Sequence, residues 1–546
     1  MQGLPRPAIL FSLLFFILGL LGISHHEMWR DELQTWLIAR DSTSLFALME
    51  NMSTEEHPAL WYIIVYFIEA LTGNPFFMQL FTLLIGTAIV FLIFKYAPFN
   101  TLQKVLFSFS YFILFEYTII SRGYGIGILL ILIYCILYAQ RHKYYVQLSV
   151  VLFLLANTTI YGTIISANLG LLLIMDYVFR RTKNNVNYIF TIKTFVGLLI
   201  FLSGIGIGLG HVIFQSTQEG YFTGAMLGTE SVKNFNWLAK NLTIVFNAYI
   251  PIPNIFDAYF WNSNILQLLP YQPRVWIGLI FSIILYLLPI FMFLRKPVLL
   301  IFYLLSSITM FVLIAFIYHG HLRHHGHFFM LFIICLWLSN YMADSSWLNK
   351  LATQGKVRIA VLVNSGCVFL YKFKLKLLTF FLTIQVVAGA CAYTLDWKLP
   401  FSNARQVGMY LSKNEFSNLP IIGSPDYAIS PITNYLNRKI FFPESQTFGS
   451  FVKWTTSRHQ FDNPTNALKA CVDDGILFIK NGQKNTLIIM SHSAIIPDPI
   501  FNKTTISNIG QMIKVEKDLE LKLIYNVKGA VILDENYYVF LLSKKD

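Results

Sequence analysis

Charged residues are scarce in this chain, and their scarcity excludes a protein that is soluble throughout. Only 13% of the 546 residues are Asp, Glu, Lys or Arg, whereas 55% are hydrophobic. A soluble fold cannot bury that much apolar surface, so the composition indicates a membrane protein. Apolar runs near the length that a bilayer requires recur from Ile9 to Gly389, separated by short polar loops.

Cysteine pairs are also missing, because the five cysteines are scattered without metal-ligand spacing. This pattern favours neither a disulfide framework nor a zinc module. No small-x-small cleavage site follows Gly22, so we expect the first apolar segment to be kept as an anchor. The formal net charge of +13 lies largely in short loops between apolar segments. It therefore reports orientation and does not indicate a nucleic-acid partner.

The basic residues gather in alternate loops, for example at Arg141–Lys143 and Arg295–Lys296. By the positive-inside rule these loops are cytoplasmic and the loops between them face outward. Cytoplasmic and outward loops alternate consistently along the chain only if Ala59–Leu71, about 13 residues long, does not cross the membrane. We expect this segment to be an interfacial helix that begins at His57-Pro58. The predicted fold is a polytopic α-helical membrane protein with about 11 transmembrane helices and a C-terminal soluble α/β domain.

The eleven expected spans are Ile9–Ile23, Met78–Phe94, Val105–Ile119, Ile126–Tyr138, Val146–Leu155, Ile164–Val178, Ile189–Phe214, Val275–Phe293, Val298–Ile317, Phe328–Leu338 and Leu375–Cys391. The segment Arg358–Leu370 stays open and could lie along the inner surface. We expect residues 1–394 to form the transmembrane domain and residues 395–546 an extracytoplasmic domain. In the latter, "LPIIGSPDY", "TLIIMSHS" and "AVILDENYYVFLLS" predict strands, and the stretch up to "ITNYLNRK" predicts a helix. We expect no catalytic constellation in this domain.

The first outer loop contains "HHEMWRDELQTWLIARD", in which an Asp-Glu pair follows the first apolar run. A helix over Trp29–Asp41 places Asp31 on the side opposite an apolar stripe. The stripe consists of Trp29, Leu33, Trp36 and Leu37. Such a helix would lie flat on the membrane and fix a carboxylate at the level of the lipid headgroups. The alternative is that Asp31 and Glu32 are solvated charges favoured by the helix dipole.

Three segments in order, "WRDELQTWLIARD", "EEHPALWYIIVYFIEALTG" and "FEYTIISRGYGIGILLILI", carry a family resemblance. The chain resembles membrane glycosyltransferases of the GT-C class, and is most similar to the protein O-mannosyltransferase and lipid A aminoarabinose transferase superfamily. The stretch His57-Pro58-Ala59-Leu60 departs from the family pattern at Ala59, where a second proline is usual. The motifs cover the first third of the chain, and the remainder matches only in layout.

The resemblance implies an inverting glycosyltransferase that moves a sugar from a polyprenyl-phosphate-linked donor to a hydroxyl acceptor on the outer face. The acceptor stays open between a glycan, a lipid and a protein. In this reading the first outer loop, residues 24–75, is catalytic, Asp31 is the base, and Glu32 has an orienting or structural role. No cofactor is certain, and a divalent metal stays open. We expect the bacterial inner membrane, with the site and the C-terminal domain in the periplasm, although a lumen is the alternative.

The stretch "YHGHLRHHGHFF" is expected to be a short outward loop between two spans, and its glycines disfavour a regular helix. Its Arg323, His324 and His325 are candidates for binding the donor phosphate. Two alternatives stay open. The imidazoles could simply sit among the lipid headgroups, or His321 and His325 could bind a metal.

Four further residues are weaker candidates around the donor. His57 could contact the phosphate or a metal, or it could cap the interfacial helix, and Glu56 would support it. Arg122 could bind the lipid phosphate or only anchor the chain, with Tyr124 beside it. Glu116 could pair with Arg122, which would make both structural.

Two other classes of function are weighed against an enzyme. A transporter usually buries charges at mid-membrane and shows inverted repeats, whereas these spans hold few ionisable residues and show no convincing repeat. A membrane-anchored protein for glycan binding or assembly would use the long loop at 222–264 and the C-terminal domain. The elaborate first outer loop favours chemistry at the membrane surface.

Overall fold

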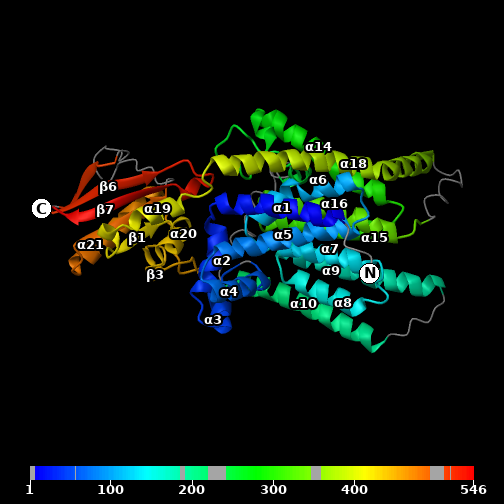
Figure 1. Cartoon of the computed structure of the whole chain (residues 1–546), viewed down its shortest axis with the longest axis horizontal. Helices are drawn as coiled ribbons and strands as arrows, with labels where there is room; N and C mark the ends of the chain where they lie inside the picture. The colour runs from blue at the N-terminus through cyan, green and yellow to red at the C-terminus, as the bar shows by residue number, and fades with distance from the viewer. Residues whose placement is uncertain are drawn as a thin grey trace.

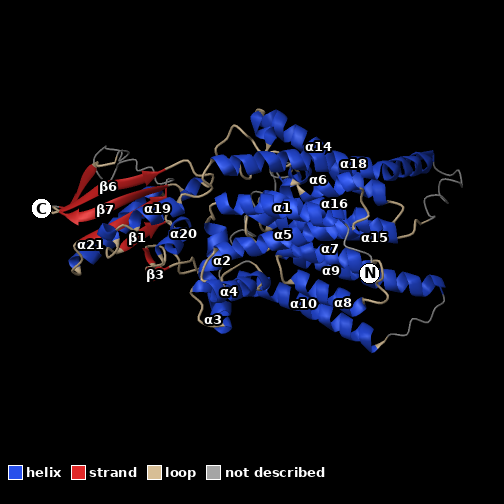
Figure 2. Ribbon diagram, in the orientation of Figure 1, coloured by secondary structure: helices blue, strands red, loops and turns tan. Residues whose placement is uncertain are grey.

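The chain folds into a bundle of long helices followed by a sheet-containing domain. The computed structural model describes residues 6–55, 57–184, 191–218, 241–345, 358–491, 509–516 and 518–545. The helices run side by side along the long axis of the molecule, and the strands lie together beyond one end of the bundle (Figures 1 and 2). Helices α2, α3 and α4 occupy the junction between the two parts (Figure 1). The predicted polytopic helical protein with a C-terminal α/β domain is confirmed.

Seven of the described helices are long and apolar enough to cross a membrane. They are α1 (Arg6–His25), α5 (Phe76–Tyr96), α9 (Ile160–Asn184), α10 (Ile192–Gln218), α14 (Tyr271–Phe293), α15 (Pro297–Phe316) and α18 (Arg358–Lys398). Each leaves large apolar side chains exposed, among them Leu10 on α1 and Ile284 on α14. Exposed apolar surface of this kind is expected where the surrounding solvent is lipid.

Shorter helices complete the bundle. They are α6 (Thr101–Ser108), α7 (Tyr124–Tyr138), α8 (Tyr145–Ala156), α13 (Ile244–Tyr249) and α16 (Leu322–Leu338), with the π-helix η1 (Tyr111–Ile119) and the 3₁₀ turns η3 (Ile265–Leu268) and η4 (Ser339–Tyr341). Every residue of α16 and of η1 is buried, so these two elements form the centre of the bundle. The count of about 11 spans stays a prediction.

One expected span and the segment left open have a different form. The segment Val105–Ile119 is interrupted, because α6 ends at Ser108 and η1 begins at Tyr111. At the break, the Ser110 hydroxyl donates to the Phe107 carbonyl oxygen (2.7 Å), and such side-chain bonds compete with helix continuation. The segment Arg358–Leu370 does not form a separate surface piece, since it is continuous with the last span in the 41-residue helix α18.

The first outer segment folds into α2 (Arg30–Arg40), α3 (Leu45–Asn51) and α4 (Leu60–Thr72). The expected short helix after His57-Pro58 is confirmed as α4, which is 13 residues long. It ends at Gly73, whose φ of +60° is a left-handed conformation that glycine adopts without strain. Its place in the membrane interface stays a prediction. The helix expected over Trp29–Asp41 is also confirmed, with Trp29 as the residue before its first turn.

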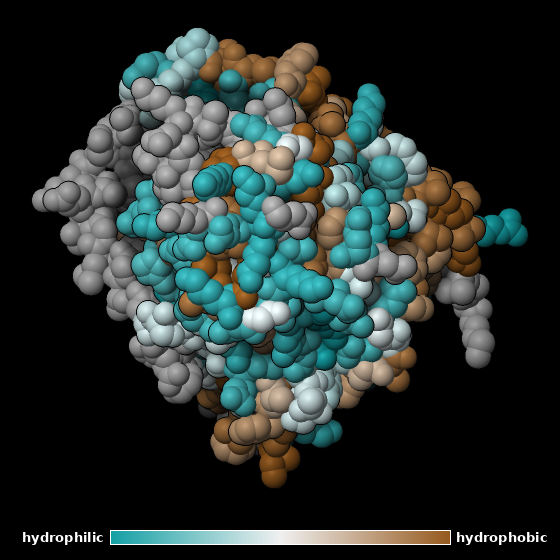
Figure 3. Space-filling model, turned by 90° about the vertical axis from the view of Figure 1, so that its left-hand side faces the viewer, coloured by the Kyte–Doolittle hydropathy of each residue, from teal (hydrophilic) through white to brown (hydrophobic). Residues whose placement is uncertain are grey.

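The C-terminal part contains a seven-stranded sheet in the order β3-β2-β1-β4-β7-β6-β5. Its strands are β1 (Ile421–Ser424), β2 (Ile440–Phe442), β3 (Thr447–Gly449), β4 (Asn485–Ser491), β5 (Met512–Glu516), β6 (Leu519–Val527) and β7 (Tyr537–Lys544). Strand β1 pairs in parallel with β2 and β4, and the remaining pairs are antiparallel. Seen from this end, the surface is mostly hydrophilic, which suits a domain surrounded by water (Figure 3).

Helices cover both faces of the sheet, and the alternation along β4 shows why. Leu487 and Ile489 pack on α19 (Ala404–Leu411) and α20 (Asp426–Leu436), whereas Ile488 and Met490 pack on α21 (Pro464–Lys480). The strands expected at "LPIIGSPDY" and "TLIIMSHS" and the helix after the first are confirmed as β1, β4 and α20. The third expected strand is only half correct. It begins at Tyr537, because Leu533–Glu535 forms the 3₁₀ turn η6.

Candidate functional site

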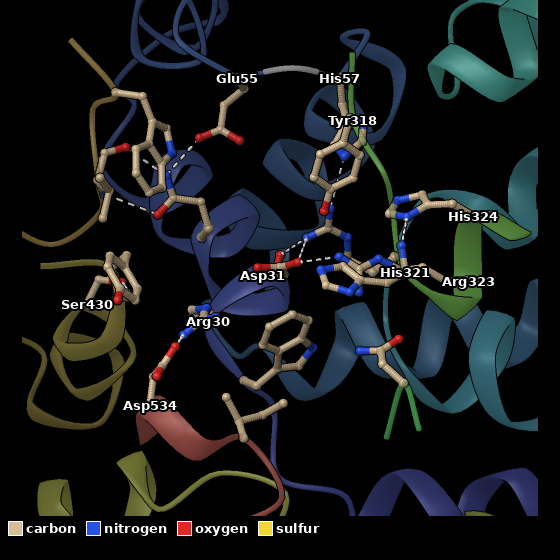
Figure 4. A pocket seen from close by; sticks show the side chains of 18 of the residues that line it. Arg30, Asp31, Glu55, His57, Tyr318, His321, Arg323, His324, Ser430 and Asp534 are labelled. Atoms are coloured by element: carbon tan, nitrogen blue, oxygen red, sulfur yellow. Dashed lines mark hydrogen bonds and ion pairs between the residues drawn. The ribbon is translucent and has the colours of Figure 1, made fainter. Parts of the chain in front are cut away.

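A cavity of about 700 Å³ lies where α2 meets the ends of the bundle helices and the sheet domain. Figure 4 shows Asp31 near its centre, with Arg323 and His324 on one side and Ser430 and Asp534 on the other. The residues that line it include Trp29, Arg30, Asp31, Gln34, Thr54, Glu55, His57, Arg122, Ile160, Tyr161, Trp261, Leu313, Ile317, Tyr318, His321, Arg323, His324, Tyr427, Ser430, Val452, Trp454, Arg458, Gln460 and Asp534.

Asp31 is held in the first turn of α2 by two arginines from distant parts of the chain. Its Oδ2 lies 2.9 Å from a terminal nitrogen of Arg323 and 3.6 Å from one of Arg122. Arg122 also donates to the Asp31 backbone oxygen. The side chain is 27% exposed, so the carboxylate reaches the cavity while its partners are mostly buried. The first helical turn suits a carboxylate, since the helix dipole favours negative charge there.

The surroundings of Asp31 keep it ionised. Burial by itself would raise the pKa of the carboxyl group, but the guanidinium groups of Arg122, Arg323 and Arg30 outweigh it and hold the pKa below its ordinary value. A carboxylate in this state accepts a proton only when its cationic partners are drawn elsewhere. Asp31 is therefore a charged hydrogen-bond acceptor that can receive a hydrogen bond from a hydroxyl group in the cavity.

Arg323 is almost completely buried, at 4% exposure, yet it is not fully bonded. Its guanidinium lies against the rings of Trp29 and Trp261, at 5.6 and 5.2 Å from their centres. Among the described residues, its Nε and one terminal nitrogen have no hydrogen-bond partner. Buried donors left without a partner are costly, and Arg323 lines the cavity, so a ligand whose acceptor oxygens reach these nitrogens would relieve that cost.

The histidine segment, residues 318–329, differs from the expected loop. Helix α16 begins at Leu322, so Arg323, His324 and His325 stand in its first turn, and Gly326 continues the helix. A Cβ on Gly326 would come within 2.6 Å of the ring carbons of Phe112, so glycine here allows helix packing and does not break the helix.

The structure brings His324 to the cavity but places His325 elsewhere. His324 Nε2 lies 2.7 Å from the Tyr124 hydroxyl, so Tyr124 supports a histidine of the cavity wall. His325 Nε2 lies 3.2 Å from the His319 carbonyl oxygen, and His325 is not among the residues that line the cavity.

The histidines on the cavity wall outside the helices are neutral. Burial, followed by the charges of Arg122 and Arg323, lowers the pKa of His57 to about 3. Burial and the charge of Arg323 lower the pKa of His321 to about 4. His57 Nε2 lies 3.1 Å from an Arg122 nitrogen, and its Nδ1 has no partner among the described residues. The positive charge that faces a ligand therefore belongs to the arginines.

Glu32 points away from the cavity, as expected for an orienting or structural residue, although its role stays a prediction. It is fully buried and accepts from the Ser121 backbone N–H (2.6 Å) and from His26 Nε2 (3.1 Å). The other nitrogen of His26 lies 3.0 Å from Asp396 on α18. Burial would lower the pKa of His26, but the two carboxylates raise it to about 10. This buried clamp joins the start of α2 to the segment that carries Arg122.

One weaker expectation is contradicted, and another falls on a residue that the structure does not describe. The pairing of Glu116 with Arg122 is wrong, because Glu116 Oε2 accepts from the Tyr111 hydroxyl (2.8 Å) and the Trp261 ring nitrogen (3.2 Å). Glu56 lies outside the described residues. Its neighbour Glu55 lines the cavity and accepts from Gln34 (2.8 Å) and the Tyr62 hydroxyl (2.7 Å).

A metal site has little support in the described part of the chain. No group of three or more His, Cys, Asp and Glu side chains there is arranged to hold a metal ion. His321 and His325, the pair considered from their spacing, do not meet. His321 faces the cavity and stacks near Trp261, whereas His325 faces His319.

The sequence did not indicate that the C-terminal domain contributes to the cavity. Arg30 donates to Asp534 (2.9 Å), 504 positions away, and its backbone N–H donates to Glu535 (2.9 Å). Gln34 exchanges two hydrogen bonds with the backbone of Val452, at 2.7 and 3.1 Å. These contacts fasten one side of α2 to the sheet domain. No local sequence pattern predicts contacts between residues this far apart in the chain.

Comparison with known proteins was made at the level of families, sequences and structures. A scan of protein-family models finds no match, and a search of curated proteins finds none either. Among solved structures, the chain is similar to ArnT from Cupriavidus metallidurans bound to undecaprenyl phosphate, with 15% identity, a TM-score of 0.42, and coverage of 98% of this chain and 97% of that chain. It is also similar to the apo state of ArnT from Cupriavidus metallidurans, with 13% identity, a TM-score of 0.49 and the same coverage. The similarity thus extends over nearly the full length at low sequence identity.

Proposed function

We propose that this chain is an inverting glycosyltransferase that moves a sugar from a polyprenyl-phosphate-linked donor to a hydroxyl group of an acceptor. One observation carries the proposal. An ionised carboxylate, Asp31, reaches a cavity beside Arg323, a buried arginine with two nitrogens that have no hydrogen-bond partner in the described part of the chain. The carboxylate can take a proton, and the arginine can bind a phosphate bidentately.

The cavity also has a side that suits a lipid. Ile160, Leu313 and Ile317 line it, and the first two belong to the membrane helices α9 and α15. An isoprenoid chain would lie along these residues, and its phosphate would then meet Arg323 and Arg122. Because the cavity-facing His57 and His321 are neutral, the two arginines and Asp31 leave one net positive charge for a phosphodiester.

The reaction then follows from the positions of these groups. The acceptor oxygen attacks the anomeric carbon and forms the new glycosidic bond, while the bond from that carbon to the phosphate oxygen breaks. The electron pair of the broken bond leaves with the lipid phosphate, and the hydroxyl proton passes to a carboxylate oxygen of Asp31. A bound phosphate shares the arginines that now lower the pKa of Asp31, so the donor itself would strengthen the base.

We also propose that the cavity and the sheet domain, residues 395–546, lie on the outer side of the membrane. The basic loops of the bundle support this orientation. Arg323, His324, His57 and Arg122 would serve the donor phosphate, and Tyr124 and Glu32 would hold parts of that arrangement in place.

The test is sugar transfer by the purified chain in lipid nanodiscs, from radiolabelled undecaprenyl phosphate sugars to membrane extracts. Undecaprenyl phosphate is chosen because one of the similar ArnT structures is bound to it. We expect Asp31→Asn to lower transfer at least about a hundredfold, because the general base is lost while the shape is kept. The matched control Asp473→Asn, at an exposed carboxylate on α21, should leave transfer unchanged.

Measurement of donor binding distinguishes two roles of Asp31, that of general base and that of counterion to the arginines. If Asp31→Asn still binds undecaprenyl phosphate but does not transfer sugar, the base role stands. Equal transfer by both proteins would show that Asp31 is not the base. Absence of transfer by the wild-type chain would favour a transporter or a membrane-anchored binding protein.

A further inference from the structure

The second side of the cavity is built by the sheet domain and has no part in the chemistry above. We call it the sheet wall, and it consists of Tyr427, Ser430, Trp454, Arg458 and Asp534. In Figure 4, Ser430 and Asp534 face Asp31 from the side opposite Arg323. The question is which ligand this arrangement fits.

The sheet wall lies at the edge of the sheet where ligands usually bind. Strand β1 has a parallel neighbour on each side, since α20 leads from β1 to β2 and α21 precedes β4. The chain thus passes from β1 to β2 on one side of β1 and later returns from β3, through α21, to β4 on the other side. The carboxyl ends of parallel strands with connections of opposite direction are the common place for a ligand in sheets of this kind. Tyr427 follows the carboxyl end of β1 by three residues and faces the cavity.

The charges of the sheet wall are balanced. Arg458 donates twice to Asp426, at 2.8 and 2.6 Å, and Arg30 donates to Asp534 at 2.9 Å. Each guanidinium is thus neutralised by a carboxylate, in contrast to Arg323, which has two nitrogens without a hydrogen-bond partner among the residues that the structure describes. The wall therefore lacks the excess positive charge that selects a phosphate. It offers instead donors and acceptors next to one another, in the two guanidinium–carboxylate pairs, which suit the hydroxyl groups of a neutral ligand.

Two aromatic rings give the wall an apolar surface among these polar groups. Tyr427 and Trp454 stack at 6.4 Å with an angle of 21° between their planes. Arg30 lies over Tyr427 (5.0 Å) and Arg458 over Trp454 (4.9 Å), so the rings and the guanidinium groups fix one another. Both residues line the cavity, so the parts of the rings that the guanidinium groups leave uncovered offer apolar surface beside fixed polar groups. Such a surface matches a sugar ring, which has apolar faces and hydroxyl groups at its edge.

A peptide acceptor fits less well. An extended peptide commonly binds by adding a strand to an open sheet edge. Among the described residues that line the cavity, none belongs to a strand, so side chains and loop backbone form this wall.

We propose that the sheet wall is the acceptor subsite, that it takes a neutral sugar ring of a glycan, and that Trp454 and Arg458 determine its specificity. The inference rests on the proposed function in that an acceptor is needed only if Asp31 serves a transfer reaction. It adds the class of the acceptor and the part of the chain that selects it.

The test measures acceptor binding without the donor, so that its outcome does not depend on transfer. The full chain in nanodiscs is applied to arrayed cell-envelope oligosaccharides and to arrayed Ser- and Thr-rich peptides. We expect binding to oligosaccharides, weakened at least about tenfold in Trp454→Ala and in Arg458→Lys. Tyr525→Ala is the matched control, because Tyr525 stacks on Tyr410 in the same domain outside the cavity. It should bind like the wild-type chain.

Each outcome decides the matter. Binding to the peptides alone, to neither array, or equally by wild type and Trp454→Ala would overturn the proposal. Undecaprenyl phosphate binding serves as the check on folding, and each variant should retain it within about twofold. Should Trp454→Ala lose it, Trp454→Phe, which keeps an aromatic ring, replaces that variant in the comparison. Oligosaccharide binding without any transfer would leave the subsite standing and remove the enzyme, whereas transfer without oligosaccharide binding would do the reverse.

Discussion

The two sides of the cavity differ in both chemistry and origin. The membrane side takes its charges from Arg122 and Arg323, which converge on Asp31. Two nitrogens of Arg323 have no hydrogen-bond partner within the described ranges. The sheet wall takes its charges in neutral pairs, Arg458 with Asp426 and Arg30 with Asp534. Donors without hydrogen-bond partners suit a charged ligand that supplies the missing acceptors. Guanidinium groups that are already paired with carboxylates suit the recognition of a neutral ligand.

The difference also shows how such a site can vary. The membrane side is fixed by fully buried elements such as α16, where a change of one side chain disturbs the packing. The sheet wall is built from loops and helix ends at the edge of a sheet, which tolerate substitution. We therefore expect the donor to be fixed by the bundle and the acceptor to be set by the C-terminal domain.

The strongest test of the difference between the two sides of the cavity is Arg323→Lys. Lysine keeps the charge but loses the planar set of donors that meets a phosphate bidentately. We expect transfer to fall about a hundredfold to a thousandfold, as when a donor that stabilises developing charge is removed. Steady-state kinetics with varied donor should show the loss, while Arg405→Lys, at an exposed position of α19, should match the wild type. A loss below about threefold would show that Arg323 serves only as the partner of Asp31.

Arg30→Gln tests the sheet wall and should have a smaller effect. Arg30 belongs to α2, but its side chain reaches Asp534 and Tyr427, and the ion pair is about a quarter exposed. Pairs of this kind contribute about 1 kcal/mol or less, so we expect the acceptor concentration for half-maximal rate to rise by at most about fivefold. The donor concentration for half-maximal rate should change less than twofold. If the donor value rises instead, Arg30 belongs to the membrane side and the division of the cavity is wrong.

Local patterns in the sequence predicted much of the fold. The short helix α4, the helix α2, and the strands β1 and β4 follow from periodicity and turn residues within a few positions. The start of α16 was not predicted, because local patterns do not show how distant segments pack. The glycine that seemed to exclude a helix is required by the approach of Phe112 from η1, which only the packed bundle reveals.

The candidate site was predicted on one side only. The motifs of the first outer loop and of the histidine segment indicated Asp31 and Arg323, and the structure brings them to 2.9 Å. The sheet wall was not foreseen, because Asp534 and Arg458 lie in segments without a recognisable motif. Their place depends on how the C-terminal domain docks on α2, and the contacts join positions about 400 to 500 apart.

Glu535→Gln gives the smallest effect and tests the joint between the two sides. Burial raises the pKa of Glu535 from 4.5 to about 7, against the opposing charge of Arg30. A carboxyl group whose pKa is raised by folding stabilises the fold fully below about pH 4.5 and loses that contribution as the pH rises through 7. The wild-type chain should therefore unfold at a lower temperature at pH 8 than at pH 5, and Glu535→Gln should narrow this difference.

Thermal unfolding at the two pH values measures the effect, with the exposed Glu50→Gln on α3 as the control that keeps the wild-type difference. Transfer at pH 6 should change little, because glutamine retains an oxygen that can accept from the Arg30 backbone N–H. An unchanged difference between pH 5 and pH 8 would mean that Glu535 does not titrate in this window. The sheet domain would then be docked on α2 by Arg30 and Gln34 without a pH-dependent contribution, and the two sides of the cavity would keep their spacing over the whole range.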